Sequence, residues 1–167
     1  MKKYLKFSGV VAALFALIAF ILMMATPAIM YKDDVVASGI VALFGQKGET
    51  PLLGLPTETK LAWSALVAWI FVITALVILI SGIVLPILKV KALNKFMGLS
   101  NCLAALLLVV GGVFTFITIV VFFTANGADN VPDNCYLGAG WIIAGVLEIL
   151  AGLLTALPLV AEFGKKK

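Results

Sequence analysis

The stretch from Leu137 to Val160, LGAGWIIAGVLEILAGLLTALPLV, decides the fold of this protein. A helix needs about 20 apolar residues to cross a bilayer core about 30 Å thick, and this stretch is long enough to do so. Its only charged side chain, Glu148, lies almost at its midpoint. A carboxylate at mid-depth costs about 3 kcal/mol even on lenient insertion scales, which points to a functional role or a close partner.

The rest of the chain has the same character. Its 167 residues are 63% hydrophobic, with a mean hydropathy of +1.21, whereas soluble domains are about half apolar. Four segments are long enough to cross a membrane: residues 7–31, 61–88, 96–125 and 136–161. The sequence therefore predicts an all-α integral membrane protein with a single membrane domain over residues 1–167.

The first segment also resembles a signal peptide, because Lys2 and Lys3 precede its apolar run. The apolar core of a signal peptide is about 7 to 15 residues long, and this run continues well beyond that length. In addition, Pro27 lies where cleavage would be expected. We expect a retained signal-anchor helix, with cleavage as the alternative.

The lysines predict the orientation. The loop 32–60 carries only Lys32, Lys47 and Lys60, and the loop 126–135 carries no lysine. The two ends of the chain and the link 89–95 carry nine: Lys2, Lys3, Lys6, Lys89, Lys91, Lys95, Lys165, Lys166 and Lys167. The positive-inside rule places both termini, the link and the tail 162–167 in the cytoplasm, and loops 32–60 and 126–135 outside. Short connections make neighbouring helices antiparallel, so we expect an antiparallel four-helix transmembrane bundle with a longer first extracytoplasmic loop. The net charge of +4 is dispersed and does not indicate nucleic-acid binding.

Two features are expected at the outer membrane surface. Residues 35–44, VVASGIVALF, are apolar but too few to cross a bilayer. They can form an interfacial helix, a re-entrant segment or a β-hairpin completed by residues 51–55, and we expect them to pack on the membrane surface. Trp63 and Trp141, near the outer ends of their segments, are typical of an interfacial aromatic belt.

Small residues recur every seven positions in each apolar segment. They are Gly9 and Ala16; Ala68, Ala75 and Gly82; Gly98, Ala105 and Gly112; and Gly138, Gly145 and Gly152. Lipid supplies no hydrophobic force between helices, so small side chains promote association by letting two backbones approach closely. A seven-residue step is typical of left-handed packing at about +20°. These stripes predict a tight bundle.

Glu148 follows Gly145 by three residues and precedes Gly152 by four, so we expect it to face the bundle interior with them. The candidate partners of its carboxyl group at matching depth are Thr74, Gly111, Gly112 and Thr115. Glycines leave space for a carboxyl group, and threonine hydroxyls can donate to it. None of the four segments contains His, Arg or Lys, so the cost of burying a charge favours the neutral acid.

Three interpretations of Glu148 remain open. In the first, a neutral acid bonds to Thr74 or Thr115 and holds helices together, with about 0.6 kcal/mol as the average for such membrane pairs. In the second, the carboxyl group alternates between proton-bound and ion-bound states in a transporter or channel. In the third, Glu148 completes a site with a polar or basic residue of another subunit.

Catalysis is not expected. The chain has no histidine, the usual general base and zinc ligand, and no nucleophile-elbow or phosphate-loop motif, so we expect neither a cofactor nor a metal site. The leading interpretation is a non-catalytic accessory or assembly subunit of the plasma membrane, in this case the bacterial inner membrane, because its basic residues are all lysine and it starts with MKK. Its expected partners are the lipid bilayer and other membrane subunits or a second copy, contacted through helix faces and the first outer loop. The alternative is a small proton- or cation-coupled transporter or channel component using Glu148.

The predicted layout resembles the tetraspan plan of claudins and their relatives, with four spans, inward termini and a longer first outer loop. Residues 32–60 have neither the tryptophan and paired cysteines of the claudin first loop nor the Cys-Cys-Gly of tetraspanins. Small multidrug exporters also have four helices and a membrane glutamate, but theirs lies in the first helix. The resemblance therefore implies a layout and no function.

Overall fold

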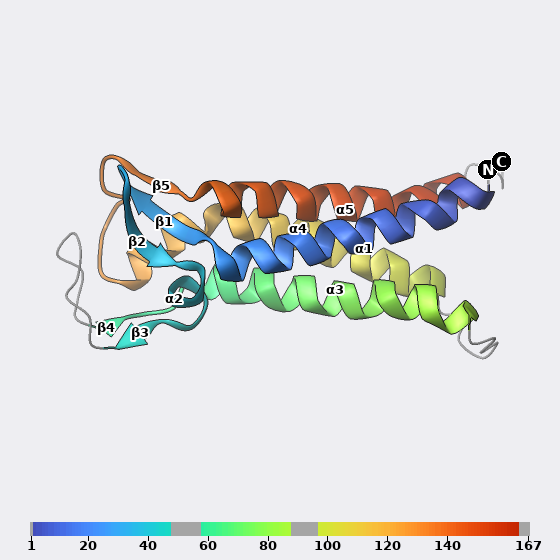
Figure 1. The fold of residues 1–167 in the computed structure, drawn as a ribbon, viewed down its shortest axis with the longest axis horizontal. Coiled ribbons are helices and arrows are strands. Elements are labelled where there is room, and N and C mark those ends of the chain that lie inside the picture. Colours follow the sequence, from blue (N-terminus) through green and yellow to red (C-terminus); the bar gives the residue numbers. More distant parts are fainter. Residues whose placement is uncertain (1, 48–57, 88–96, 164–167) are drawn as a thin grey trace.

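Four long helices dominate the structure, a computed structural model that describes residues 2–47, 58–87 and 97–163. They are α1 (Lys2–Ala25), α3 (Trp63–Ile87), α4 (Met97–Ala125) and α5 (Ala139–Phe163). The four lie side by side along the long axis of the molecule (Figure 1). Each contains a segment long and apolar enough to cross a membrane, which confirms that part of the prediction.

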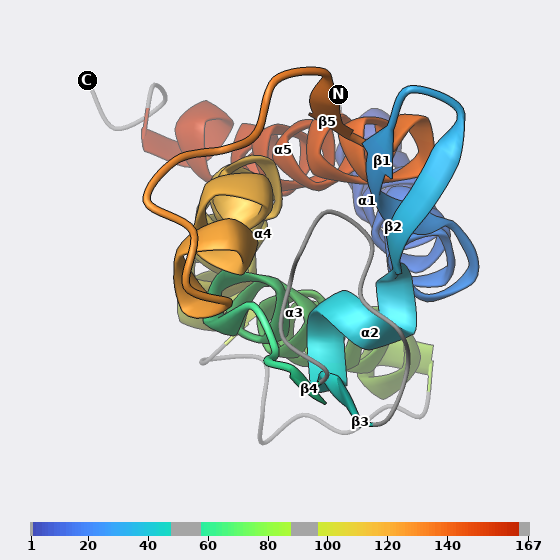
Figure 2. The same ribbon diagram turned by 90° about the vertical axis from the view of Figure 1, so that its left-hand side faces the viewer.

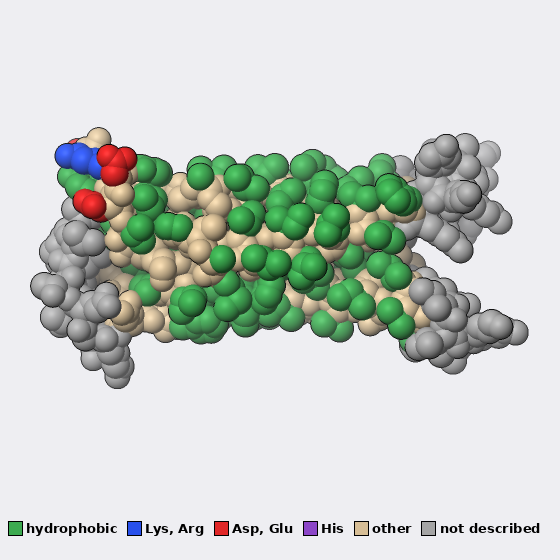
Figure 3. All heavy atoms as spheres, in the orientation of Figure 1, with side chains coloured by type: hydrophobic (Ala, Val, Ile, Leu, Met, Phe, Trp, Pro, Cys, Tyr) green, Lys and Arg blue, Asp and Glu red, His purple; other side chains and the backbone are tan. Residues whose placement is uncertain are grey.

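The helices are arranged around a common axis. Helix α4 contacts α3 and α5, and α1 contacts the same two helices from the other side (Figure 2). Small side chains fill much of the interior, as with the fully buried Ala16, Ala68 and Ala144, beside a few large ones such as Trp141 and Phe122. Large apolar side chains face outward and cover the helical body, and the charged side chains that the structure describes, apart from the buried Glu148, lie at one end (Figure 3). Small residues inside and large apolar residues outside are the arrangement that suits helices in lipid.

A small antiparallel sheet lies at one end of the helices, which we call the sheet end. Its strands are β1 (Pro27–Tyr31), β2 (Asp34–Ser38) and β5 (Cys135–Leu137), in the order β2-β1-β5. Met30 is paired with Val35 on one side and with Tyr136 on the other. The start of α1 and the end of α5 lie at the opposite end of the molecule (Figure 1).

The expectation of an all-α protein is therefore wrong at the sheet end. Helix α1 stops at Ala25, not at the predicted residue 31, and α5 starts at Ala139, not at 136. Pro27 explains the first difference, since it has no N–H and disfavours helical geometry in the residue before it. The apolar residues that follow it satisfy their backbone groups by pairing with β2 and β5.

The apolar stretch 35–44 forms part of a strand and a short helix, and the strand pairs with β1, a partner that the sequence did not predict. Its first residues complete β2, and the rest form the short helix α2 (Gly39–Phe44), which the Ser38 hydroxyl caps by accepting from the Val41 amide at 3.3 Å. Helix α2 buries Leu43 and packs on the ends of α1 and α3. Strands β3 (Gln46–Lys47) and β4 (Glu58–Thr59) pair beyond it. The predicted hairpin partner 51–55 and the link 89–95 lie outside the described residues.

Two glycines allow the sheet end to pack closely against the C-terminal end of α1. A Cβ atom at Gly39 would lie 1.9 Å from the carbonyl oxygen of Met23, and one at Gly138 would lie 2.0 Å from that of Pro27. Neither position has room for any side chain. The amide of Gly39 also donates to the Thr26 carbonyl at 3.0 Å. The first and second loops are thus joined to the end of α1 by close backbone contact.

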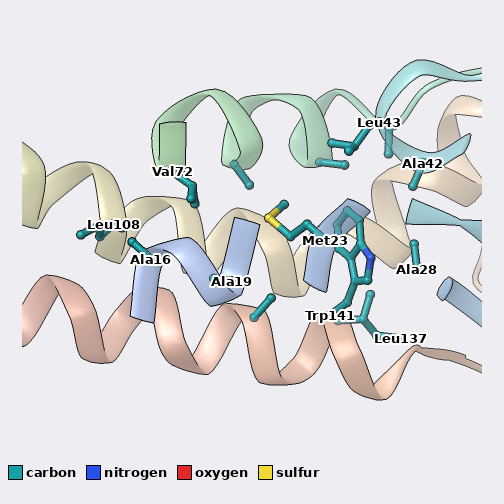
Figure 4. Packing of buried hydrophobic residues seen from close by; sticks show 14 of the residues in the cluster. Ala16, Ala19, Met23, Ala28, Ala42, Leu43, Val72, Leu108, Leu137 and Trp141 are labelled. Atoms are coloured by element: carbon teal, nitrogen blue, oxygen red, sulfur yellow. The ribbon is translucent and has the colours of Figure 1, made fainter. Parts of the chain in front are cut away.

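Trp141 does not belong to an interfacial belt. Its side chain is fully buried and lies near Met23, Ala28 and Leu137 just below the sheet (Figure 4). Trp63 is 52% exposed, as a belt residue requires. The sequence pattern cannot tell that Trp141 is buried and Trp63 is exposed. Helix α5 starts only two residues before Trp141, and the sheet covers that end of the helix.

Candidate functional site

Glu148 belongs to α5 and is fully buried against α4. Two glycines of α4, Gly111 and Gly112, lie against it. A Cβ atom at Gly111 would lie 3.2 Å from Oε2 of Glu148, and one at Gly112 would lie 3.4 Å from Cβ of Glu148. The same Cβ at Gly112 would lie 2.8 Å from the carbonyl oxygen of Gly145. The two glycines of α4 therefore create the space that the carboxyl group occupies.

Thr115 is the hydrogen-bonding partner of the carboxyl group. Its Oγ1 lies 3.3 Å from Oε1 and 3.2 Å from Oε2 of Glu148, and 3.1 Å from the carbonyl oxygen of Gly111. A hydroxyl has one hydrogen, so it cannot donate to all three acceptors at once. A neutral acid resolves this, because it donates its own proton to Oγ1 of Thr115 while that hydroxyl donates to the Gly111 carbonyl. The geometry suits the protonated form of Glu148.

The expected contribution of Thr74 is not found. Thr74 is exposed on α3, and its hydroxyl donates to the carbonyl of Ile70 at 2.8 Å, one turn back in its own helix. The α3 residues next to the site are instead Ala68 and Phe71, which lie near Gly111. Thr74 and Thr115 match in depth by sequence, but the rotation of a helix about its axis decides which way a side chain points.

The carboxyl group lies early along α3 but at the middle of α4, where Gly111 is fourteen residues from each end of the helix. A Cβ at Gly111 would lie 3.2 Å from its Oε2 and 3.7 Å from the carbonyl oxygen of Ala68. Ala68 follows Trp63, the first residue of α3, by only five residues, or about 7.5 Å along the axis. Side chains lean toward the N-terminus of their helix, and the N-terminus of α5 is at the sheet end.

A second buried polar pair lies one turn of α4 closer to the sheet end. The hydroxyl of Ser64 donates to Oγ1 of Thr118 at 3.3 Å, and Thr118 donates to the Phe114 carbonyl at 3.0 Å. Both side chains are fully buried. The sequence predicts the bond from Thr118 to its own helix, which is common for membrane hydroxyls, but not the contact with Ser64. The sequence did indicate a second polar position beside the acid, because Thr118 and Thr115 are three residues apart and lie on the same face of their helix.

The small-residue stripes meet where α4 and α5 cross. A Cβ at Gly145 would lie 3.4 Å from the Gly112 carbonyl oxygen, and one at Gly152 would lie 2.9 Å from that of Ala105. Other predicted stripe residues that are buried are Ala16, Ala68, Ala75 and Gly138. Such close approaches between two backbones require residues without large side chains.

Three stripe positions depart from this pattern. Gly82 has one neighbour in range, Oδ1 of Asn101 at 3.8 Å from its ideal Cβ. Gly98 is exposed and, like Gly9, has nothing within 4 Å of an added Cβ, so neither is a packing residue within the described part of the chain. Gly9 and Gly98 lie near the end opposite the sheet, where neighbouring helices no longer touch at these positions. A seven-residue step in the sequence does not show where along a helix such contacts end.

Asn126 forms a clamp that the sequence did not predict. Its Oδ1 accepts from the amide of Lys60 at 2.7 Å, while its Nδ2 donates to the Lys60 carbonyl at 3.1 Å and to that of Phe122 at 2.8 Å. The side-chain amide of Asn126 thus bonds to both the N–H and the C=O of Lys60, as the backbone of a neighbouring β-strand would. It ties the end of α4 to the segment before α3, and its bonds account for its burial.

Within the described residues, no three His, Cys, Asp or Glu side chains lie close enough to hold a metal ion. The chain matches no protein-family model and no curated protein. The buried acid, its hydroxyl partner and the exposed surfaces are therefore the guides to function.

Proposed function

We propose that this protein is an accessory or assembly subunit of the bacterial inner membrane, without catalytic activity. In this proposal the four long helices form an antiparallel transmembrane bundle, the sheet end faces outward, and both termini are cytoplasmic. Four apolar helices with outward-facing large side chains support the membrane placement. The distribution of lysines supports the orientation.

The observation that carries the subunit role is the closed surroundings of Glu148. The side chain is fully buried, two glycines of α4 lie against it, and Thr115 satisfies its carboxyl group. A neutral acid bonded in this way needs no substrate ion and no second subunit for its stability. The site acts as a connection between α4 and α5 and leaves the outer surfaces for partners.

The sheet end offers the most distinctive of those surfaces. Ile40 and Phe44, one turn apart on α2, are 53% and 51% exposed, and Val35 on β2 is 44% exposed. Among the residues that the structure describes, strand β2 is also an edge of its sheet, with β1 on one side only. Exposed apolar side chains beside a free strand edge are typical of an interaction surface. The partner that suits it is another membrane protein with an apolar outer segment.

Native purification tests this proposal. The tagged chain is extracted from its own membranes under mild conditions, and the co-purifying chains are quantified. We expect a second membrane protein at a fixed ratio, and a loss of that protein when Ile40→Gln alters the α2 surface. Asn130→Gln, at an exposed residue of the second loop, is the matched control. Isolation of a homo-oligomer alone would instead favour the transporter or channel alternative.

A further inference from the structure

The sheet end contains a pocket of about 560 Å³ between the end of α2, the segment 59–61 before α3 and the end of α4, which we call the α2 pocket. Binding sites for small molecules usually have volumes of about 300–1,000 Å³. We infer that the α2 pocket holds an anionic phospholipid whose phosphate contacts Lys60. The inference rests on the membrane placement proposed above, and it adds a lipid ligand to the proposed subunit.

The first support is the level at which the α2 pocket lies. Its wall includes Ala125, the last residue of α4, and Leu61, which comes two residues before the first residue of α3. The candidate membrane spans of these helices, Trp63–Leu85 and Gly98–Ala125, reach the same two ends. In a bilayer the polar headgroups flank the apolar core that the spans cross. The α2 pocket therefore lies where a headgroup joins its acyl chains.

The second support is the mixture of apolar and polar residues that line the α2 pocket. Phe44 and Leu61 line it and are 51% and 36% exposed. Gln46 and Thr59 also line it, and they are paired directly across β3 and β4, so their side chains lie on the same face of that ladder. A phospholipid matches both kinds of lining, since its acyl chain covers the exposed apolar side chains and its headgroup meets the polar ones.

The third support is charge complementarity. Lys60 is exposed, and none of the described residues that line the α2 pocket is acidic. The side-chain donors of Gln46, Thr59 and Lys60 form no hydrogen bond or ion pair in the described part of the chain, because the bonds of Lys60 are made by its backbone. An amide, a hydroxyl and an ammonium group can all donate to phosphate oxygens, and the ammonium bond is strengthened by its charge.

The fourth support is the fixed backbone around Lys60. Asn126 binds the N–H and the C=O of Lys60 at 2.7 and 3.1 Å. A Cβ atom at Gly45 would lie 2.7 Å from the carbonyl oxygen of Thr59, so the end of α2 packs directly on the segment before α3. The walls of the α2 pocket are thus held in place before a ligand binds, which lowers the entropic cost of binding.

Native mass spectrometry of the intact protein in detergent micelles tests this inference. The protein is titrated with phosphatidylglycerol, and the bound fraction gives the dissociation constant. Phosphatidylcholine with the same acyl chains tests the need for an anionic headgroup, and inorganic phosphate added as a competitor distinguishes a lipid site from a site for free phosphate. Lys60→Gln removes the charge. Lys32→Gln is the matched control, at an exposed lysine of the same end that does not line the pocket.

We expect one molecule of phosphatidylglycerol to bind saturably, and more tightly than phosphatidylcholine. Lys60→Gln should weaken this binding about three- to fivefold, as expected for the loss of one exposed ion pair, whereas Lys32→Gln should leave it unchanged. Ala125→Phe keeps the charge but takes up part of the pocket, so it should weaken the binding as well. Far-ultraviolet circular dichroism verifies that each variant is folded.

The absence of saturable binding, or equal affinities for the two lipids, would overturn the inference. So would an unchanged affinity in Lys60→Gln or in Ala125→Phe, or an equal loss in Lys32→Gln. Displacement of the lipid by inorganic phosphate would show a site for the free ion instead. None of these results depends on a co-purifying protein: binding of the lipid at Lys60 without such a partner would contradict the subunit proposal alone.

Discussion

Oγ1 of Thr115 lies within 3.3 Å of both carboxyl oxygens of Glu148, and this contact is a side-chain hydrogen bond between α4 and α5. The same hydroxyl lies 3.1 Å from the Gly111 carbonyl oxygen. One threonine thus links the acid to the backbone of the neighbouring helix. The stability and the protonation of the site both depend on this contact.

Replacing Thr115 with valine should destabilise the protein modestly. Valine keeps the shape of threonine but leaves the carboxyl group of Glu148 without its partner. Hydrogen bonds between membrane helices contribute about 0.6 kcal/mol on average and up to about 1.7, and we expect a loss in this range. Unfolding by denaturing detergent in mixed micelles measures the free energy. Thr74→Val is the control, since that hydroxyl bonds only within α3 and should change stability by less. Equal losses would contradict the role of Thr115.

Glu148→Gln should have little effect on folding and on partner binding. The glutamine amide can donate to Oγ1 of Thr115 as the neutral acid does, and it has nearly the same volume. The expected change in unfolding free energy is below about 1 kcal/mol. In proteoliposomes, a pH-dependent ion flux that Glu148→Gln abolishes would contradict the subunit proposal and favour coupled transport.

Gly112→Ala should destabilise the contact between α4 and α5. The added methyl group would lie 2.8 Å from the Gly145 carbonyl oxygen and 2.7 Å from Cγ1 of Ile149, so the helices must move apart. Overpacking of this kind costs about 1–3 kcal/mol. Gly98→Ala is the matched control on the same helix, because nothing lies within 4 Å of its added Cβ and alanine favours the helix. Thermal unfolding of both variants in the same detergent measures the effect: Gly112→Ala should lower the unfolding temperature, and Gly98→Ala should not.

Asn126→Ala should loosen the segment before α3. It removes three hydrogen bonds and leaves the amide of Lys60 without its acceptor, at a cost of about 1–3 kcal/mol. Hydrogen exchange followed by mass spectrometry should show faster exchange around Lys60. Asn130→Ala, at an exposed residue, should change neither quantity. Unaltered exchange at Lys60 would show that the clamp does not hold this segment.

Cys135 should react slowly with thiol reagents at neutral pH. Partial burial raises the pKa of its thiol above the ordinary value, and only the thiolate reacts. Labelling should therefore accelerate as the pH rises through the ordinary range of a thiol and beyond it. A membrane-impermeant maleimide added to intact cells should label Cys135 from outside if the sheet end is extracytoplasmic.

Cys135→Ser is the control for that experiment. It leaves Cys102, which is exposed on the apolar part of α4 and should be shielded by lipid from an impermeant reagent. Labelling of the Cys135→Ser protein, or labelling of Cys135 only after the cells are opened, would contradict the proposed orientation.

Local properties of the chain determined most of the architecture. Length and hydropathy located the four long helices, because a run of apolar residues long enough to cross a bilayer needs no information from elsewhere in the chain. The seven-residue stripes likewise indicated the close approach of α4 and α5 at Gly112 and Gly145. The step between Gly145 and Glu148 directed attention to the acid.

Tertiary structure alone decided the sheet and the details of the site. Residues 27–31 and 136–137 were assigned to helices, but their backbone groups pair across more than a hundred residues, which no local pattern reports. The choice of Thr115 over Thr74 depends on how each helix is rotated against its neighbours. Hydropathy is a property of each segment, whereas rotation, register and strand pairing arise from contacts between segments, so they became visible only in the folded chain.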